Sequence, residues 1–162
     1  MKYLGCVILG RTNLSEWAYS FTEDAPSGFS AVGGQCLHPD DIHEDVSGSS
    51  SGSAAGIKLN YFTFSLGTET QGSLLSPAIS VRNVCTLKPS LGTWPKEDII
   101  PVNYDQDSCG PMTRNIKDVE LLHKIASGIQ YNPNDDSRPL RVGYLGKKFY
   151  LFLNTFFQFI VL

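Results

Sequence analysis

The sequence has few charged residues and no basic cluster. Charged side chains make up 18% of its 162 residues, and the formal net charge is −3. A surface that binds nucleic acid needs clustered lysine and arginine to neutralise phosphates. The sequence therefore argues against direct binding of nucleic acid, while its hydrophobic content of 41% is typical of a globular domain.

Cysteine is also scarce, and no Cys-x-x-Cys pair occurs. The four cysteines stand far apart, at Cys6, Cys36, Cys85 and Cys109. This spacing predicts neither a zinc site nor a redox motif, and nothing in the sequence indicates a cofactor. His38 and His43 have no third ligand at a suitable spacing, so we interpret them as loop histidines rather than a metal pair.

Long hydrophobic runs are missing as well. The run at 4–9 ends at Gly10–Arg11, whereas a membrane-spanning helix needs about 20 apolar residues. The tail at 146–162 is rich in aromatic residues but also too short. We interpret it as a buried element or as a segment foreign to the parent fold, not as a membrane anchor. A cytoplasmic protein with reduced thiols is therefore expected.

Hydrophobic periodicity and capping residues predict several elements. These are a buried strand at 4–9, a helix after an Asn13–Glu16 capping box, a helix start at 52–55, a strand at 61–66, an amphipathic helix between Asn115 and Gly128, and a strand at 140–145. Residues 20–53 carry no such pattern. An irregular connection of this length is uncommon in a compact domain unless it builds a site.

Two serine-rich glycine loops, at 47–54 and 67–73, contain the candidate catalytic residues. A serine hydroxyl is a poor nucleophile unless a neighbouring base removes its proton. A glycine-flanked serine after a strand also exposes consecutive backbone N–H groups, which can hold the oxyanion of an acyl-transfer intermediate. In the second loop these donors are the N–H groups of Thr70, Gln71, Gly72 and Ser73.

The first loop also matches G-x-S-x-G, the nucleophile elbow of α/β-hydrolases, with Ser50 at its centre. That elbow must follow a buried strand, but the preceding residues 43–46 are polar. The only later histidine, His123, lies on the predicted amphipathic helix. We therefore reject this interpretation.

Six ordered stretches resemble motifs of amidase signature enzymes. They are Gly10–Ala18, Ser27–Gln35, Ser47–Ala54, Gly67–Ala78, Leu87–Ser90 and Gln106–Met112. The resemblance implies an α/β fold, a partial amidase signature domain over 1–145 in which helices surround a mixed β-sheet. The tail at 146–162 has no match to the family. Among the departures, His38–Pro39 replaces an Asn-Pro pair, and Gln71 stands where the family has glycine or aspartate.

The resemblance further implies a Ser-Ser-Lys mechanism. The nucleophile corresponds to Ser73, and the bridging serine, which in the family sits next to a cis peptide bond, corresponds to Ser49. The family's base is a lysine far upstream of the bridging serine. Only Lys2 precedes Ser49 here, in a different context, whereas Lys58 and Lys88 follow it. The sequence thus predicts a family fragment, shortened at both ends, that lacks its general base.

The leading hypothesis is a hydrolase of carbon–nitrogen amide bonds that acts on a small amide or peptide amide and is inactive as this fragment. One alternative is a non-catalytic remnant or interaction protein. Another is the glutaminase subunit of an amidotransferase that serves glutamyl-tRNA. The residues of the motifs at 27–35 and 106–112 resemble those of peptide amidases more closely, which favours the first hypothesis. The sequence indicates neither substrate-binding residues nor an oligomeric state.

Overall fold

The computed structural model describes residues 5–21 and 24–129. In chain order its elements are a 3-10 helix η2 (Glu16–Tyr19), strands β1 (Phe29–Ser30) and β2 (Gly34–Gln35), helix α1 (Ser51–Lys58), strand β3 (Phe64–Glu69), helix α2 (Leu75–Val81), strands β4 (Cys85–Thr86) and β5 (Ser108–Thr113), and helix α3 (Ile116–Ser127). The strand expected at 140–145 and the tail at 146–162 lie outside the described residues.

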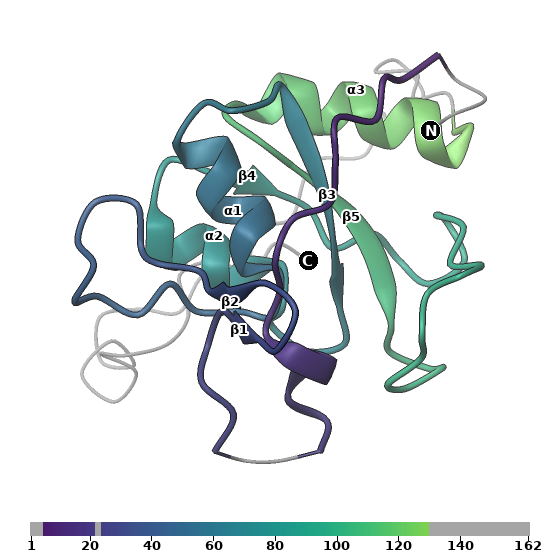
Figure 1. Ribbon diagram of the computed structural model, residues 1–162. Helices are drawn as coiled ribbons and strands as arrows, with labels where there is room; N and C mark the ends of the chain where they lie inside the picture. Colours follow the sequence, from purple (N-terminus) through teal and green to yellow (C-terminus); the bar gives the residue numbers. More distant parts are fainter. Residues whose placement is uncertain (1–4, 22–23, 130–162) are drawn as a thin grey trace, which may run out of the picture. The chain divides into compact units, whose positions relative to one another are not determined.

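A three-stranded sheet with the order β3-β5-β4 forms the centre of the fold, and both of its strand pairs are antiparallel. Strand β5 lies between its neighbours and is buried along most of its length. Figure 1 shows α1 and α2 side by side next to the long β3–β5 pair, with α3 across one end of it. Sheet and helices therefore alternate along the chain, which confirms the α/β fold class.

Small residues allow α1 to approach β3 and α2 closely. Ala54, Ala55 and Ile57 of α1 are buried in one core cluster with Val46, Leu74, Val81 and Met112. Gly56 is required in α1 because a Cβ there would collide with the ring of Phe62. The core thus lies directly behind the two serine-rich loops, since α1 begins at the end of the first and α2 follows the second.

Helix α3 confirms the amphipathic pattern between Asn115 and Gly128. The Asn115 side chain accepts a hydrogen bond from the Asp118 N–H, as an N-cap does. Gly128 ends the helix in the left-handed conformation, with φ of 68°. Val119 and Leu122 are the two buried residues of the helix. Local capping chemistry was therefore enough to predict both ends of this element.

The buried strand predicted at 4–9 is wrong. Residues 6–10 are in no regular element, and the side chains of Val7, Ile8 and Leu9 are 82%, 61% and 74% exposed. Within the described residues, this segment pairs with no strand. An apolar run becomes a strand only when a neighbour accepts its backbone hydrogen bonds, and periodicity alone does not supply one.

The capping box at Asn13 and Glu16 is also wrong. The Asn13 amide instead donates to the carbonyls of Gly28 and Gly34, and the Glu16 carboxylate accepts from the Ala31 N–H. Both side chains therefore fix the β1–β2 hairpin, the only regular structure between 20 and 50 in the described residues. Long-range hydrogen bonds replace the local ones, and only the short helix η2 forms.

The strand predicted at 61–66 begins later than expected, at Phe64, and extends through Glu69. Gly67, Thr68 and Glu69, expected in a loop, pair with residues of β5. The helix start predicted at 52–55 lies within α1, which begins at Ser51. In the described part of the chain, no helix is long and apolar enough to cross a membrane.

Candidate active site

Ser49 and Ser73 lie in two loops that are joined through their backbones. The Ser50 N–H donates to the Ser73 carbonyl at 3.1 Å, and the Ser15 N–H donates to the Ser49 carbonyl at 3.0 Å. Both serines are buried, with 4% and 7% of their surface exposed, and both line one cavity of about 50 Å³. The structure therefore brings together the two serines that the sequence predicted as catalytic.

The Ser49 loop is closely packed. Its Gly48–Ser49 peptide bond is cis, and the resemblance implied a cis bond next to the bridging serine. A Cβ at Gly48 would collide with the hydroxyls of Ser15 and Tyr19, so glycine is required there. The Ser51 hydroxyl closes the loop from the other side by donating to the Ser47 carbonyl at 2.6 Å.

The hydroxyls of Ser49 and Ser73 do not form the hydrogen bond with each other that their roles require. Among the described residues, neither hydroxyl has a hydrogen-bond partner, although both serines line the same cavity. Catalytic hydrogen bonds are often long or misaligned without substrate and tighten in the complex. The direct contact between the two hydroxyls therefore stays a prediction.

The other serines of the first loop bind backbone. The Ser50 hydroxyl donates to the Thr68 carbonyl and accepts from the Thr68 N–H, each at 3.1 Å. The Ser53 hydroxyl donates to the Leu66 carbonyl at 2.7 Å. Ser50 is thus used to attach the loop to β3, which is consistent with rejecting it as the nucleophile of an elbow.

The second loop presents four backbone N–H groups, at residues 70–73, that donate to no atom of the described residues. Gly72 allows the turn, because its φ is +81°. The buried carboxylate of Glu69 supports the loop by accepting from the N–H groups of Leu74 and Leu75 at 2.8 and 3.0 Å. These free donors are suited to hold an anion.

Lys88 and Asp107 fix Thr70, at the start of the second loop. The Lys88 amine donates to the Thr70 carbonyl at 2.6 Å, and the Thr70 hydroxyl donates to the Asp107 carboxylate at 2.5 Å. The other Asp107 oxygen accepts from the N–H groups of Val102 and Asn103. Sequence reasoning did not assign these roles, although both residues lie in the recognised stretches at 87–90 and 106–112.

Burial raises the pKa of Asp107, but hydrogen bonds from Thr70, Asn103 and Val102, together with the charge of Lys96, outweigh it and leave that pKa below its ordinary value. Asp107 is therefore a carboxylate at neutral pH. A charged acceptor strengthens each of the hydrogen bonds that it receives. The second loop and the segment at 102–103 are thus held together by an ionised group.

The cavity beside Ser73 has an apolar wall. Ile99, Ile100 and Val102 line it together with Ala18. A second cavity of about 470 Å³ also reaches Ser73, and Tyr19, Ser20, Gln71 and Ser76 are among the residues that line it. Sequence reasoning found no substrate-binding residues, because the wall belongs to an irregular segment with no hydrophobic periodicity.

Neither Lys58 nor Lys88 donates to Ser49. The Lys58 amine pairs with the Asp40 carboxylate at 2.8 Å, and Lys88 binds Thr70. Lys2 lies outside the described residues. Within 5–21 and 24–129, no group of three or more histidine, cysteine, aspartate or glutamate side chains could hold a metal ion.

Comparisons with known proteins identify the family of the chain. Residues 1–151 match the family model for amidases. The chain is 42% identical over 137 residues to a probable amidase of Arabidopsis thaliana, a match that covers 85% of this chain and 26% of that protein. It is 34% identical over 128 residues to a glutamyl-tRNA(Gln) amidotransferase subunit of Sulfurisphaera tokodaii, and this match covers 79% of this chain and 26% of that protein.

A solved structure of a peptide amidase also matches the chain. The native peptide amidase of Stenotrophomonas maltophilia matches with a TM-score of 0.72 and 40% identity, over 85% of this chain and 28% of that one. The chain therefore spans about a quarter of the length of the relatives that it matches. Because the family model covers most of its residues, the chain belongs to the amidase family.

Proposed function

We propose that Ser73 is the nucleophile and Ser49 the bridging serine of an amide-hydrolysing site. The observation that carries this proposal is their shared cavity, next to backbone donors without other partners. Family membership supports an amidase-type hydrolase. The resemblance of the two loops to the family's motifs supports the roles proposed for Ser73 and Ser49.

The geometry supports acyl transfer in two steps. The Ser73 hydroxyl attacks the amide carbonyl carbon while its proton passes to Ser49, which passes its own proton to a base. The N–H groups at 70–73 hold the negative oxygen of the tetrahedral intermediate. The carbon–nitrogen bond then breaks and the nitrogen leaves with a proton, so that an ester remains on Ser73. Water hydrolyses this ester and restores the hydroxyl.

The substrate is a small amide or a peptide amide. The wall formed by Ile99, Ile100 and Val102 suits an apolar group next to the reacting carbonyl. The larger cavity, which Gln71 and Ser76 help to line, suits a remainder that can form hydrogen bonds. The comparison with a peptide amidase has higher identity than that with the amidotransferase protein, 40% against 34%. This difference favours the amidase over the glutaminase alternative.

We expect these 162 residues alone to hydrolyse no amide. The mechanism needs a lysine as base, and neither Lys58 nor Lys88 donates to Ser49. Loss of one member of a catalytic triad lowers kcat by several orders of magnitude. This is the specific reason to retain the alternative of a non-catalytic remnant for the isolated chain, whereas the same loops would be competent in a fold that supplies the base.

The test is to incubate the purified chain with a simple anilide and with a fluorophosphonate probe, alongside Ser73→Ala. We expect no turnover and no labelling above the Ser73→Ala control. Amide exchange across β3 and β5, measured on the same samples, shows that the chain is folded. Turnover or labelling that disappears in Ser73→Ala would mean that another group activates Ser73. The proposal that the isolated chain is inactive would then be wrong.

A further inference from the structure

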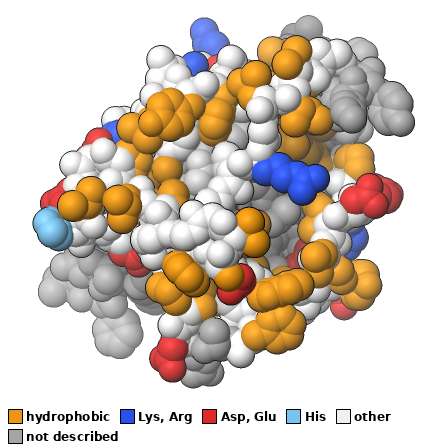
Figure 2. Space-filling model, viewed as in Figure 1, with side chains coloured by type: hydrophobic (Ala, Val, Ile, Leu, Met, Phe, Trp, Pro, Cys, Tyr) orange, Lys and Arg blue, Asp and Glu red, His pale blue; other side chains and the backbone are white. Residues whose placement is uncertain are grey.

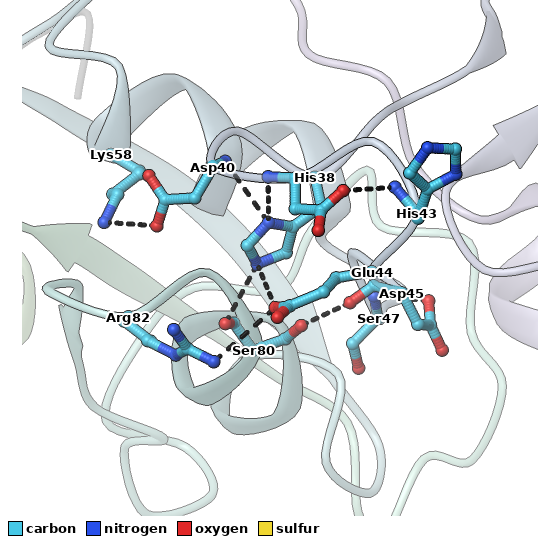
Figure 3. A network of polar contacts seen from close by, with 10 residues as sticks. His38, Asp40, His43, Glu44, Asp45, Ser47, Lys58, Ser80 and Arg82 are labelled. Carbon is cyan, nitrogen blue, oxygen red and sulfur yellow. Dashed lines mark hydrogen bonds and ion pairs between the residues drawn. The ribbon is translucent and has the colours of Figure 1, made fainter.

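A buried histidine stands behind the Ser49 loop, outside the cavities described above. The His38 side chain has no exposed surface, whereas His43 of the same segment is exposed. Figure 3 shows the His38 ring in the centre of a network of polar groups, while the ring of His43 points away from it. A buried imidazole needs partners for both ring nitrogens.

The partners of His38 define its protonation state. Its Nδ1 accepts from the backbone N–H groups of Asp40 and Asp41, both at 3.3 Å. A backbone N–H can only donate, so Nδ1 carries no proton. The single ring proton is therefore on Nε2, which donates to the Ser80 carbonyl near the end of α2 at 3.1 Å. The ring is neutral in this arrangement.

Ser80 connects His38 to the Ser49 loop. Besides accepting from His38, Ser80 donates through its hydroxyl to the Asp45 carbonyl. The Asp45 carboxylate in turn accepts from the Ser47 N–H at 2.8 Å. Ser47 is two residues before Ser49. The segment at 38–47 is therefore tied at two points to α2, the helix that follows the Ser73 loop.

Two carboxylates near the ring form ion pairs with basic side chains. The Glu44 carboxylate lies 3.6 Å from Nε2 and is shared with the Arg82 guanidinium at 3.5 Å. The Asp40 carboxylate faces Lys58 at 2.8 Å. The Glu44 and Asp40 carboxylates thus each have a cationic partner, and the neutral ring is compatible with both ion pairs. A proton on Nδ1 would instead point an N–H donor at the backbone N–H donors of Asp40 and Asp41.

We propose that His38 is a positioning residue, which through its Nε2–H bond to Ser80 holds the Ser49 loop in register with the Ser73 loop. The inference rests on the proposed role of Ser49, but the contacts that carry it are independent of catalysis. Its local bonds to Asp40 and Asp41 shape the turn, and the bond to Ser80 joins that turn to α2.

The two functions of the ring can be separated by substitution. Asparagine places an oxygen where His38 has Nδ1, so His38→Asn keeps the turn but cannot reach Ser80. His38→Ala loses both sets of bonds. His43→Ala, in the same segment, removes only an exposed ring and serves as the matched control.

The experiment is amide hydrogen exchange by NMR on the full 162-residue chain. The reporters are Ser47, which donates to Asp45, and Ser50, which donates to Ser73. We expect both to exchange at least about tenfold faster in His38→Ala and in His38→Asn. Asp40 and Asp41 should exchange faster only in His38→Ala. His43→Ala should leave all four amides unchanged.

Unchanged exchange of Ser47 and Ser50 in His38→Asn would overturn the proposal. If His38→Ala does not fold, His38→Asn and the imidazole ¹⁵N shifts of the unmodified chain still decide. A proton found on Nδ1 at neutral pH would also overturn it. Because exchange does not depend on hydrolysis, failure here leaves the assignment of Ser73 intact, and absence of hydrolysis leaves the role of His38 intact.

Discussion

Asp107 connects the candidate nucleophile loop to the apolar wall of its cavity. One carboxylate oxygen accepts from Thr70 and the other from the N–H groups of Val102 and Asn103. The segment that contains the wall has no helix or strand to hold it, so these hydrogen bonds replace regular structure. Asp107 therefore affects both the shape of the cavity and the stability of the fold.

Replacing Asp107 should destabilise the protein in a pH-dependent way. We expect Asp107→Asn to lower the free energy of unfolding by about 1–3 kcal/mol at pH 7, because one acceptor becomes a donor and the charge is lost. The folded-state pKa of Asp107 lies below its ordinary value. Its stabilisation is therefore complete above about pH 4, near the unfolded pKa, and is lost as pH falls through the lowered folded-state pKa.

Urea unfolding at several pH values measures this difference. Asp105→Asn is the control, because Asp105 is exposed in the same segment. The difference between the Asp107→Asn variant and the unmodified chain should shrink towards acid pH. Equal effects of the two substitutions at pH 7 would refute the role given to Asp107.

Residue assignments from the sequence succeeded where a motif named the residue and failed where a contact had to be known. Ser49 and Ser73 were predicted from their motifs, and the structure places both at one cavity. Asn13 was misassigned as a helix cap because its partners, Gly28 and Gly34, are distant in sequence. A side chain that can satisfy either local or distant backbone groups gives the same pattern in both cases.

At the scale of elements, local signals predicted α3 better than any strand. Helix α3 has its cap, its apolar face and its glycine stop within one continuous segment. Strand β3 was placed three residues early, because its bounds depend on pairing with β5, from Glu69 with Ser108 to Phe64 with Thr113. Strand β5 itself shows no clean alternation, since residues on both of its faces are buried.

The cap of α3 gives a prediction at this scale. Asn115→Ala should lower the free energy of unfolding by about 1 kcal/mol, because the Asp118 N–H loses its acceptor. Asn115→Ser should restore most of the loss, since serine is also a good N-cap. Lys117→Ala, at an exposed position in the first turn, is the control. Thermal or urea unfolding provides the measurement, and an effect no larger than that of Lys117→Ala would contradict the capping role.

At the scale of the whole molecule, the described residues expose many large apolar side chains. Val32, Val7, Phe21 and Tyr104 are 99%, 82%, 77% and 72% exposed. Figure 2 shows hydrophobic side chains spread over the face that it presents. Contiguous exposed apolar surface marks sites of interaction or of aggregation.

Since the relatives are about four times longer than the part matched here, a full-length relative offers a suitable host for testing the site.

The most direct test of the Ser73 assignment uses such a host. The matching segment of the Stenotrophomonas maltophilia peptide amidase, 40% identical, would be replaced by residues 5–129 of this chain. The chimaera is treated with a fluorophosphonate probe, and the modified residue is located by peptide mass spectrometry. Ser49→Ala and Ser73→Ala versions of the chimaera are treated in parallel, and exchange protection of β3 and β5 shows that each version is folded.

We expect the adduct on Ser73 in the chimaera, a loss of labelling rate of about a hundredfold or more in Ser49→Ala, and no adduct in Ser73→Ala. The isolated chain should remain unlabelled under the same conditions, because no lysine within its described residues donates to Ser49. An adduct on Ser50 or another serine, or labelling that persists in a folded Ser73→Ala chimaera, would contradict the account.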